Sequence, residues 1–297
     1  MHGTIDGFSY GLVTPVAGFL MACLGAALGL RCTMRCLRTQ HAWKPGGLAL
    51  GAASIGSGIW TMHFIAMTGF VVAEAPVGYD RPTTFASLVV GIVMVGIGIF
   101  IVGYRAATRL ALLTGGTITG LGIATMHYLG MAGMRLDGGR IDYDLLSVAL
   151  SVVIAVAAAT GALWVVVSRR GFLASLAASV VMGAASTGMH YTAMAGVHVH
   201  LEATGGPGGE PATELLVPML LGPAVFLLLA GVAVVVDPLL VTGGGARNAG
   251  SGGVRRLRPG VPTQRMRANP ARRDRRDQVD TAAARSALRR SADLHDV

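Results

Sequence analysis

Seven long apolar stretches limit what this chain can fold into. A helix that crosses a bilayer needs about 20 predominantly apolar residues. The 297-residue chain is 53% hydrophobic and only 13% charged, whereas soluble domains carry roughly 25% charged residues. The sequence therefore predicts an all-α membrane protein with seven transmembrane helices. We expect these helices at residues 8–30, 46–72, 83–103, 110–132, 145–167, 172–197 and 215–236.

The charges between these stretches predict how the protein lies in the membrane. Basic residues follow the first, third and fifth stretch, and acidic residues predominate in the segments between them. Because basic loops stay in the cytoplasm, we expect the N-terminus outside and the C-terminus inside, as seven spans require. The opening sequence MHGTIDGFSYG has no basic start, so we interpret the first stretch as a retained helix rather than a signal peptide.

A short motif recurs three times inside the apolar stretches. It reads TMHFIAM at 61–67, TMHYLGM at 125–131 and TGMHYTAM at 187–194. A constant period of 63 to 64 residues indicates a tandem repeat. Each copy lies near the outer end of an even-numbered span, so we expect three parallel two-helix repeats plus a seventh helix at their flank. The histidines of the three copies then lie at one depth and can converge on one site.

The residue types of the motif favour a soft metal ion. Residues four apart share a helix face, which pairs His63 with Met67, His127 with Met131, and His190 with Met194. Imidazole and thioether ligands suit copper, Cu(I) most of all, and the motifs hold no carboxylate for a hard cation. The preceding methionines lie about 100° round the helix, so they either flank this site or face a neighbouring helix; they are Met62, Met126 and Met189. A single such histidine could equally hydrogen-bond a neighbouring helix, with methionine filling gaps, but three copies in register favour a site.

The letters MHYT at 189–192 spell the signature of a known family. The chain resembles the MHYT family of bacterial integral membrane sensor domains over residues 8–236, with Phe64 in place of the first tyrosine. The resemblance implies a multi-pass protein of the bacterial inner membrane that binds one or two copper ions. It also implies that the copper senses a diatomic gas: oxygen, carbon monoxide or nitric oxide. By this resemblance the metal ligands are Met62, His63, Met67, Met126, His127, Met131, Met189, His190 and Met194.

The residues after the last span have a different composition. We expect two parts, a membrane domain at 1–236 and a basic, mostly disordered cytoplasmic tail at 237–297. From residue 238 the tail holds 13 arginines against five acids, too polar to bury a core. Members of the family often carry an output module here, and none is recognisable in this sequence. The tail suits a signalling partner or anionic lipid; nucleic-acid binding is disfavoured because no aromatic residue interleaves the arginines.

These observations favour a sensor without catalytic activity. The sequence shows no phosphate-binding loop, nucleotide fingerprint or nucleophile elbow. One alternative is a transporter or channel for copper or another small solute, although a permeation path needs polar groups through the whole depth of the membrane. A second alternative is a haem-bearing electron-transfer protein, because two histidines on facing helices also ligate haem iron.

Overall fold

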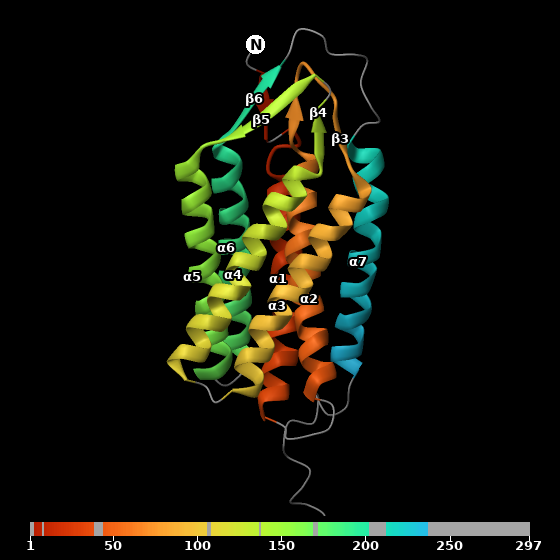
Figure 1. Cartoon of the computed structure of the whole chain (residues 1–297). Helices are drawn as coiled ribbons and strands as arrows, with labels where there is room; N and C mark the ends of the chain where they lie inside the picture. The colour runs from red at the N-terminus through yellow and green to blue at the C-terminus, as the bar shows by residue number, and fades with distance from the viewer. Residues whose placement is uncertain are drawn as a thin grey trace, which may run out of the picture. The chain divides into compact units, whose positions relative to one another are not determined.

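Seven helices, each long and apolar enough to cross a membrane, make up most of the structure, a computed structural model. It describes residues 3–7, 9–38, 44–105, 108–136, 138–168, 172–201 and 212–236. The prediction of seven membrane-crossing helices is confirmed (Figure 1). They are α1 (Val13–Arg38), α2 (Lys44–Thr68), α3 (Arg81–Tyr104), α4 (Arg109–Ala132), α5 (Leu145–Ser168), α6 (Phe172–Ala195) and α7 (Ala212–Val236).

Some helix ends differ from the predicted spans. Helix α1 continues to Arg38, so Arg31 and Arg35 belong to its last turns rather than to a loop. Helices α2 and α6 end four and two residues earlier than predicted, because short strands follow them. Hydropathy alone does not separate a short apolar strand from one more turn of an apolar helix.

Three two-stranded antiparallel sheets lie at one end of the bundle, where the sequence indicated only loops (Figure 1). Each sheet joins the strand before a helix pair to the strand after it, which gives three β-α-α-β units and confirms the two-helix repeat. The pairs are β1 (Ile5–Asp6) with β2 (Val71–Val72), β3 (Val77–Tyr79) with β4 (Met134–Leu136), and β5 (Gly139–Tyr143) with β6 (Val197–Leu201).

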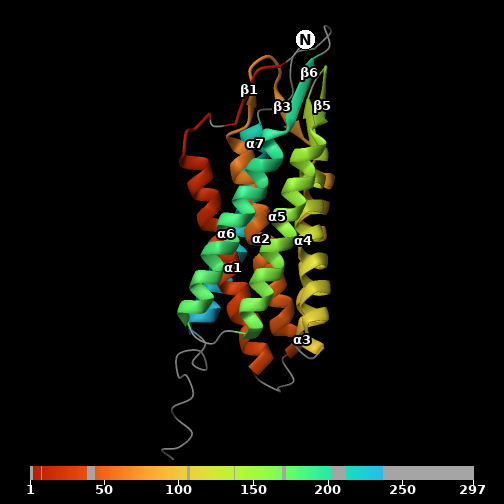
Figure 2. The ribbon, with the colours of Figure 1, turned by 90° about the vertical axis from the view of Figure 1, so that its left-hand side faces the viewer.

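Helices α1 to α6 form a closed ring in chain order. Each helix packs against the next, and α6 packs against α1, while α7 lies outside the ring against α2 and α1 (Figures 1 and 2). Helices α1 and α2 are in backbone contact, because a Cβ at Gly25 would lie 2.6 Å from the Cα of Gly58. Small residues of this kind let membrane helices approach closely without a hydrophobic driving force.

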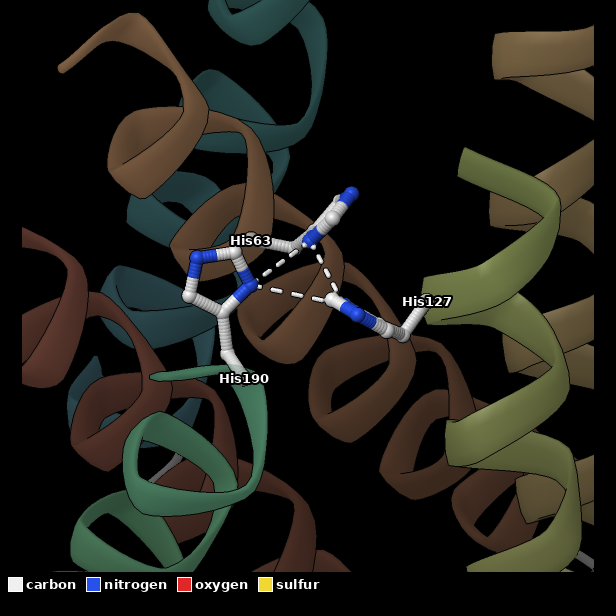
Figure 3. A group of neighbouring side chains, drawn as sticks. All are labelled: His63, His127 and His190. Carbon is white, nitrogen blue, oxygen red and sulfur yellow. Dashed lines mark hydrogen bonds between the residues drawn. The ribbon is translucent and has the colours of Figure 1, made fainter. Parts of the chain in front are cut away.

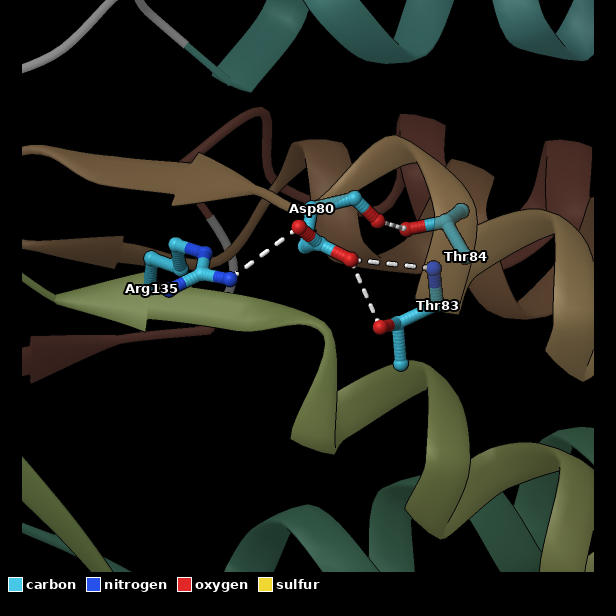
Figure 4. Close-up of polar contacts among 4 residues, drawn as sticks. All are labelled: Asp80, Thr83, Thr84 and Arg135. Carbon is cyan, nitrogen blue, oxygen red and sulfur yellow. Dashed lines mark hydrogen bonds and ion pairs between the residues drawn. The ribbon is translucent and has the colours of Figure 1, made fainter.

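Backbone hydrogen bonds tie the start of each helix pair to its end. The amide of Asp80 donates to the carbonyl of Gly133 at 2.8 Å, and the amide of Asp144 donates to that of Gly196 at the same distance. Asp80 also caps α3, because its Oδ2 accepts from the Thr83 amide at 3.0 Å, and its Oδ1 pairs with Arg135 at 3.0 Å (Figure 4). These contacts fix the ends of α4 and α6, where the motif residues lie.

Candidate metal site

Three buried histidines from the even-numbered helices meet at the centre of the ring. His63, His127 and His190 each lie five residues before the last residue of α2, α4 and α6, and each is only 1% exposed. Their Nδ1 atoms point toward one another (Figure 3), at 3.0 Å for His63–His190, 3.1 Å for His63–His127 and 3.3 Å for His127–His190. The structure therefore brings together the three histidines that the motif singled out.

Hydrogen bonding alone cannot satisfy this triangle. In a neutral imidazole each ring nitrogen is either a donor or an acceptor. Three nitrogens in mutual contact cannot be assigned so that every pair holds one donor and one acceptor. At least one pair must then place two protons or two lone pairs against each other, in a setting where unmade hydrogen bonds are costly. A cation that accepts a lone pair from all three nitrogens removes this conflict.

The spacing of the nitrogens fits a small metal ion. Four ligands placed tetrahedrally at about 2.0–2.1 Å from an ion, as histidine nitrogens are around zinc, lie about 3.3 Å from one another. The observed 3.0–3.3 Å is within a few tenths of an ångström of that value. Among the described residues, no cysteine, aspartate or glutamate joins the group. An all-imidazole set suits copper or zinc better than magnesium or calcium.

The aromatic residue after each histidine reaches toward the next repeat. Tyr128 on α4 shares a hydrogen bond of 2.7 Å with Ser151 on α5, and Tyr191 on α6 faces Thr14 on α1 in a looser contact. Its ring stands edge-on to His190, with centroids 4.9 Å apart. The rings of His127 and His190 are therefore each backed by a tyrosine that faces a helix of the next repeat.

The first repeat replaces this contact in a different way. Phe64 has no hydroxyl, and Ser87, which is 64 residues before Ser151, instead accepts a hydrogen bond of 3.0 Å from the indole of Trp60. Trp60 also donates to the carbonyl of Thr84 at 3.3 Å and packs on Phe64 with ring centroids 4.6 Å apart. The substitution of tyrosine by phenylalanine therefore leaves the serine satisfied.

Gly130, three positions after His127, leaves room for the imidazole of His63. A Cβ at Gly130 would lie 2.7 Å from Nε2 of His63, so even alanine would crowd that ring. Nε2 of His63 and Nε2 of His127 are buried and have no hydrogen-bond partner among the described side chains and backbone. The sequence did not reveal this role, because only the packed bundle shows which helix face meets which ring.

The methionines of the motif are buried but not all alike. All are 1% exposed except Met194, which is partly buried. Met62 packs against α1, where a Cβ at Gly18 would lie 3.3 Å from its Cγ, and Met126 packs in the same way against Gly91 of α3, at 3.1 Å. These two side chains face neighbouring helices, one of the two expected placements. Metal binding by all six methionines of the motif stays a prediction.

The fold and the site define a polytopic membrane protein with a buried histidine triad that fits a soft metal ion. Comparison with known families then identifies it further. The MHYT family profile, described as "Bacterial signalling protein N terminal repeat", matches residues 56–115 and 120–179. The membrane domain of this chain belongs to the MHYT family of bacterial signalling proteins, as its motif predicted, and the protein is an integral protein of the bacterial inner membrane.

Several curated signalling proteins share this region. The chain is 36% identical over 211 residues to the bifunctional diguanylate cyclase/cyclic di-GMP phosphodiesterase MucR of Pseudomonas aeruginosa, over 68% of this chain and 30% of that protein. It is 33% identical to the cyclic di-GMP phosphodiesterase NbdA of the same organism, over 70% of this chain and 27% of that protein. The signalling protein YkoW of Bacillus subtilis is 27% identical over 65% of this chain and 24% of its own length.

The chain thus spans less than a third of the length of these relatives. The matching region is their MHYT sensor region and not their catalytic domains. No solved structure matches the chain. These similarities establish a membrane signalling domain, and they leave the identity of the metal and of the signal to the chemistry of the site.

Proposed function

We propose that this protein is a membrane sensor that holds copper between His63, His127 and His190 and responds to a diatomic gas or to redox state. The observation that carries the proposal is the mutual approach of three buried Nδ1 atoms to 3.0–3.3 Å. A copper ion bound there would supply a soft Lewis-acid centre that can bind oxygen, carbon monoxide or nitric oxide. Methionine sulfur from Met67, Met131 and Met194 is available one helical turn further along.

The residues of the chain would prepare this centre in three ways. The three helices hold the imidazoles at one depth, so little reorganisation is needed when an ion binds. The aromatic rings beside the histidines and the surrounding apolar side chains exclude bulk water but admit small neutral molecules. The contacts of Tyr128 with α5 and of Tyr191 with α1 connect ligand geometry to helix position.

The two alternative functions are less well supported. A haem plane inserted between two of the histidines would have to separate rings whose nitrogens now lie at hydrogen-bonding distance. For copper transport, the candidate ligands cluster at one level near the outer helix ends rather than along the bundle. Saturable copper flux into proteoliposomes would nevertheless favour transport, and an intense Soret band would favour haem.

Metal analysis of the purified protein tests the copper site. We expect copper in the wild-type protein and none above background in a variant with His63, His127 and His190 all changed to alanine. Near-native helix content by circular dichroism must accompany the loss, so that unfolding is not its cause. A folded triple variant that keeps its full copper content would show that the histidines are packing residues.

We also propose that the signal leaves through a cytoplasmic partner or an anionic lipid surface bound by residues 237–297, which lie outside the described residues. The excess of arginine in this segment supports the proposal, because each arginine near an anionic membrane contributes about 1 kcal/mol. Co-sedimentation with vesicles of neutral or anionic lipid, for the protein in nanodiscs with and without residues 243–297, tests whether this segment binds anionic lipid. Equal binding of anionic vesicles by the full-length and truncated proteins would exclude this role.

A further inference from the structure

The gaps between neighbouring repeats are not equally filled at the outer end of the bundle. In the gap between α2 and α3, Trp60 and Phe64 pack with Tyr79, which is 6% exposed. In the gap between α4 and α5, Ala124 occupies the position equivalent to Trp60, 64 residues further along the chain. Tyr143 occupies the position equivalent to Tyr79 and is 38% exposed. The second gap therefore lacks one large ring, and its tyrosine lies nearer to the surface.

A pocket of about 560 Å³ opens in this second gap. Its lining includes Met131 and Tyr128 from the motif on α4, Met134 on β4, and Val148 on α5, and Arg140 and Tyr143 lie at the exposed end. Tyr128 is in edge contact with His127, with ring centroids 4.9 Å apart. The pocket thus joins the outer surface to the residues next to one histidine of the triad.

Two buried methionines, Met131 and Met134, are among the residues that line this pocket. Met134 is 7% exposed, and its sulfur accepts a long hydrogen bond of 3.9 Å from the hydroxyl of Tyr79, which holds the side chain in place. Met131 is 1% exposed and lies one helical turn, about 6 Å along α4, beyond His127. By burial and by position along the chain, Met134 lies nearer to the exposed rim and Met131 nearer to the triad.

We propose that this pocket is the route by which a soft monovalent cation, Cu(I), reaches the triad, with Met134 and then Met131 as transient thioether ligands. The inference rests on the proposed copper site. At each step a bond from copper to the next sulfur or nitrogen forms as the bond to the previous ligand breaks, and the oxidation state does not change. Thioethers suit this role because they bind Cu(I) selectively and remain uncharged, so the ion is not trapped on the way.

Copper loading kinetics test the route separately from the final site. Purified protein in nanodiscs is mixed without oxygen with Cu(I) bicinchoninate, and the loss of the chelate's colour gives both a rate and an end point. We expect Met134→Leu to slow loading by about tenfold at an unchanged end point. Met182→Leu is the control, since Met182 is a buried methionine of α6 away from the pocket.

A second variant tests the pocket without removing sulfur. Val148→Phe places a ring in the pocket and should also slow loading, whereas Leu150→Phe, on the exposed face of the same helix, should not. Wild-type rates in both Met134→Leu and Val148→Phe would overturn the route. A lower end point in Met134→Leu would also overturn it, because Met134 would then be a ligand of the final site. Absence of copper uptake by the wild-type protein would instead refute the copper site on which the route depends.

Discussion

Each position of the repeated motif has its own physical task at the centre of the bundle. The histidine supplies an Nδ1 atom, as in the 3.0 Å approach of His63 and His190. The aromatic residue that follows reaches the next repeat, as Tyr128 does through Ser151. In the second copy, Gly130, three positions after His127, admits the ring of His63. A motif this short recurs because each of these positions faces a different neighbour.

Methionine substitutions should separate ligands from packing residues. We expect Met67→Leu to weaken copper binding moderately, and Met62→Leu to leave it unchanged, because Met62 packs against Gly18 of α1. Leucine keeps volume and apolarity, so the comparison tests ligation. Any single His→Ala change should lower the copper affinity by more than the 10- to 100-fold that loss of a supporting residue typically causes. Titration with a competing chelator measures all of these affinities; equal values for both methionine variants would contradict ligation by Met67.

Gly130 provides a test of geometry that removes no ligand. A methyl group there would lie 2.7 Å from Nε2 of His63 and must displace the ring. We expect Gly130→Ala to weaken copper binding by about tenfold, in the range typical of residues that orient a ligand. Gly161→Ala on α5 is the matched control, because a Cβ at that position meets no atom within 4 Å. If both variants bind copper like the wild type, the position of the His63 ring does not matter.

The helices could be predicted from sequence, whereas the strands could not. A run of some 20 apolar residues is a local signal, and the predicted span at 110–132 differs from α4 by only one residue. Strand pairing is not local: Val77 pairs with Leu136 and Tyr79 with Met134, across the whole of α3 and α4. Similarly, the repeat predicts that the histidines share one depth. Whether their Nδ1 atoms point toward one another depends on how six helices pack.

The start of α3 allows a stability prediction. Hydrogen bonds from the Thr83 side chain and amide, together with Arg135, lower the pKa of Asp80 from 3.8 to about 2. We expect Asp80→Ala to lower the melting temperature by roughly 2–4 °C. Arg135→Ala should change it by less than about 1 °C, because the Arg135 side chain is 72% exposed and exposed ion pairs contribute little. Similar melting temperatures for the two variants would mean that the cap is unimportant.

The same capping contact predicts a pH dependence. The folded-state pKa of Asp80 is lowered, so the carboxylate stabilises the fold above its ordinary pKa and loses this effect as the pH falls from about 4 toward 2. The difference in melting temperature between wild type and Asp80→Ala should therefore stay constant between about pH 5 and 8 and shrink in acid. Thermal unfolding followed by circular dichroism over this range measures it, and a difference that grows in acid would contradict the assignment.

At the scale of the whole molecule, charge and architecture agree on orientation. Asp80, Asp142 and Asp144 lie at the end that carries the strands, and Arg105 and Arg109 lie at the opposite ends of α3 and α4. Since basic segments remain in the cytoplasm, we expect the strands to face outward and the histidine triad to lie in the outer half of the membrane. The copper site and its access pocket would then lie in the outer half of the membrane, where the gas binds. The signal would be passed on at the cytoplasmic side.

This orientation can be tested with reporters at three positions. A fluorescent protein, which folds only in the cytoplasm, should be active when fused after Val297 or inserted between Arg105 and Arg109. Alkaline phosphatase, which needs an oxidising compartment, should be active only when inserted near Gly206. With seven spans, the insertion site between Arg105 and Arg109 and the site near Gly206 lie on opposite sides of the membrane. The C-terminus then lies in the cytoplasm. Reporter activity in the same compartment at Gly206 and Val297 would remove α7 as a membrane span, and activity reversed at all three positions would place the triad in the inner half of the membrane.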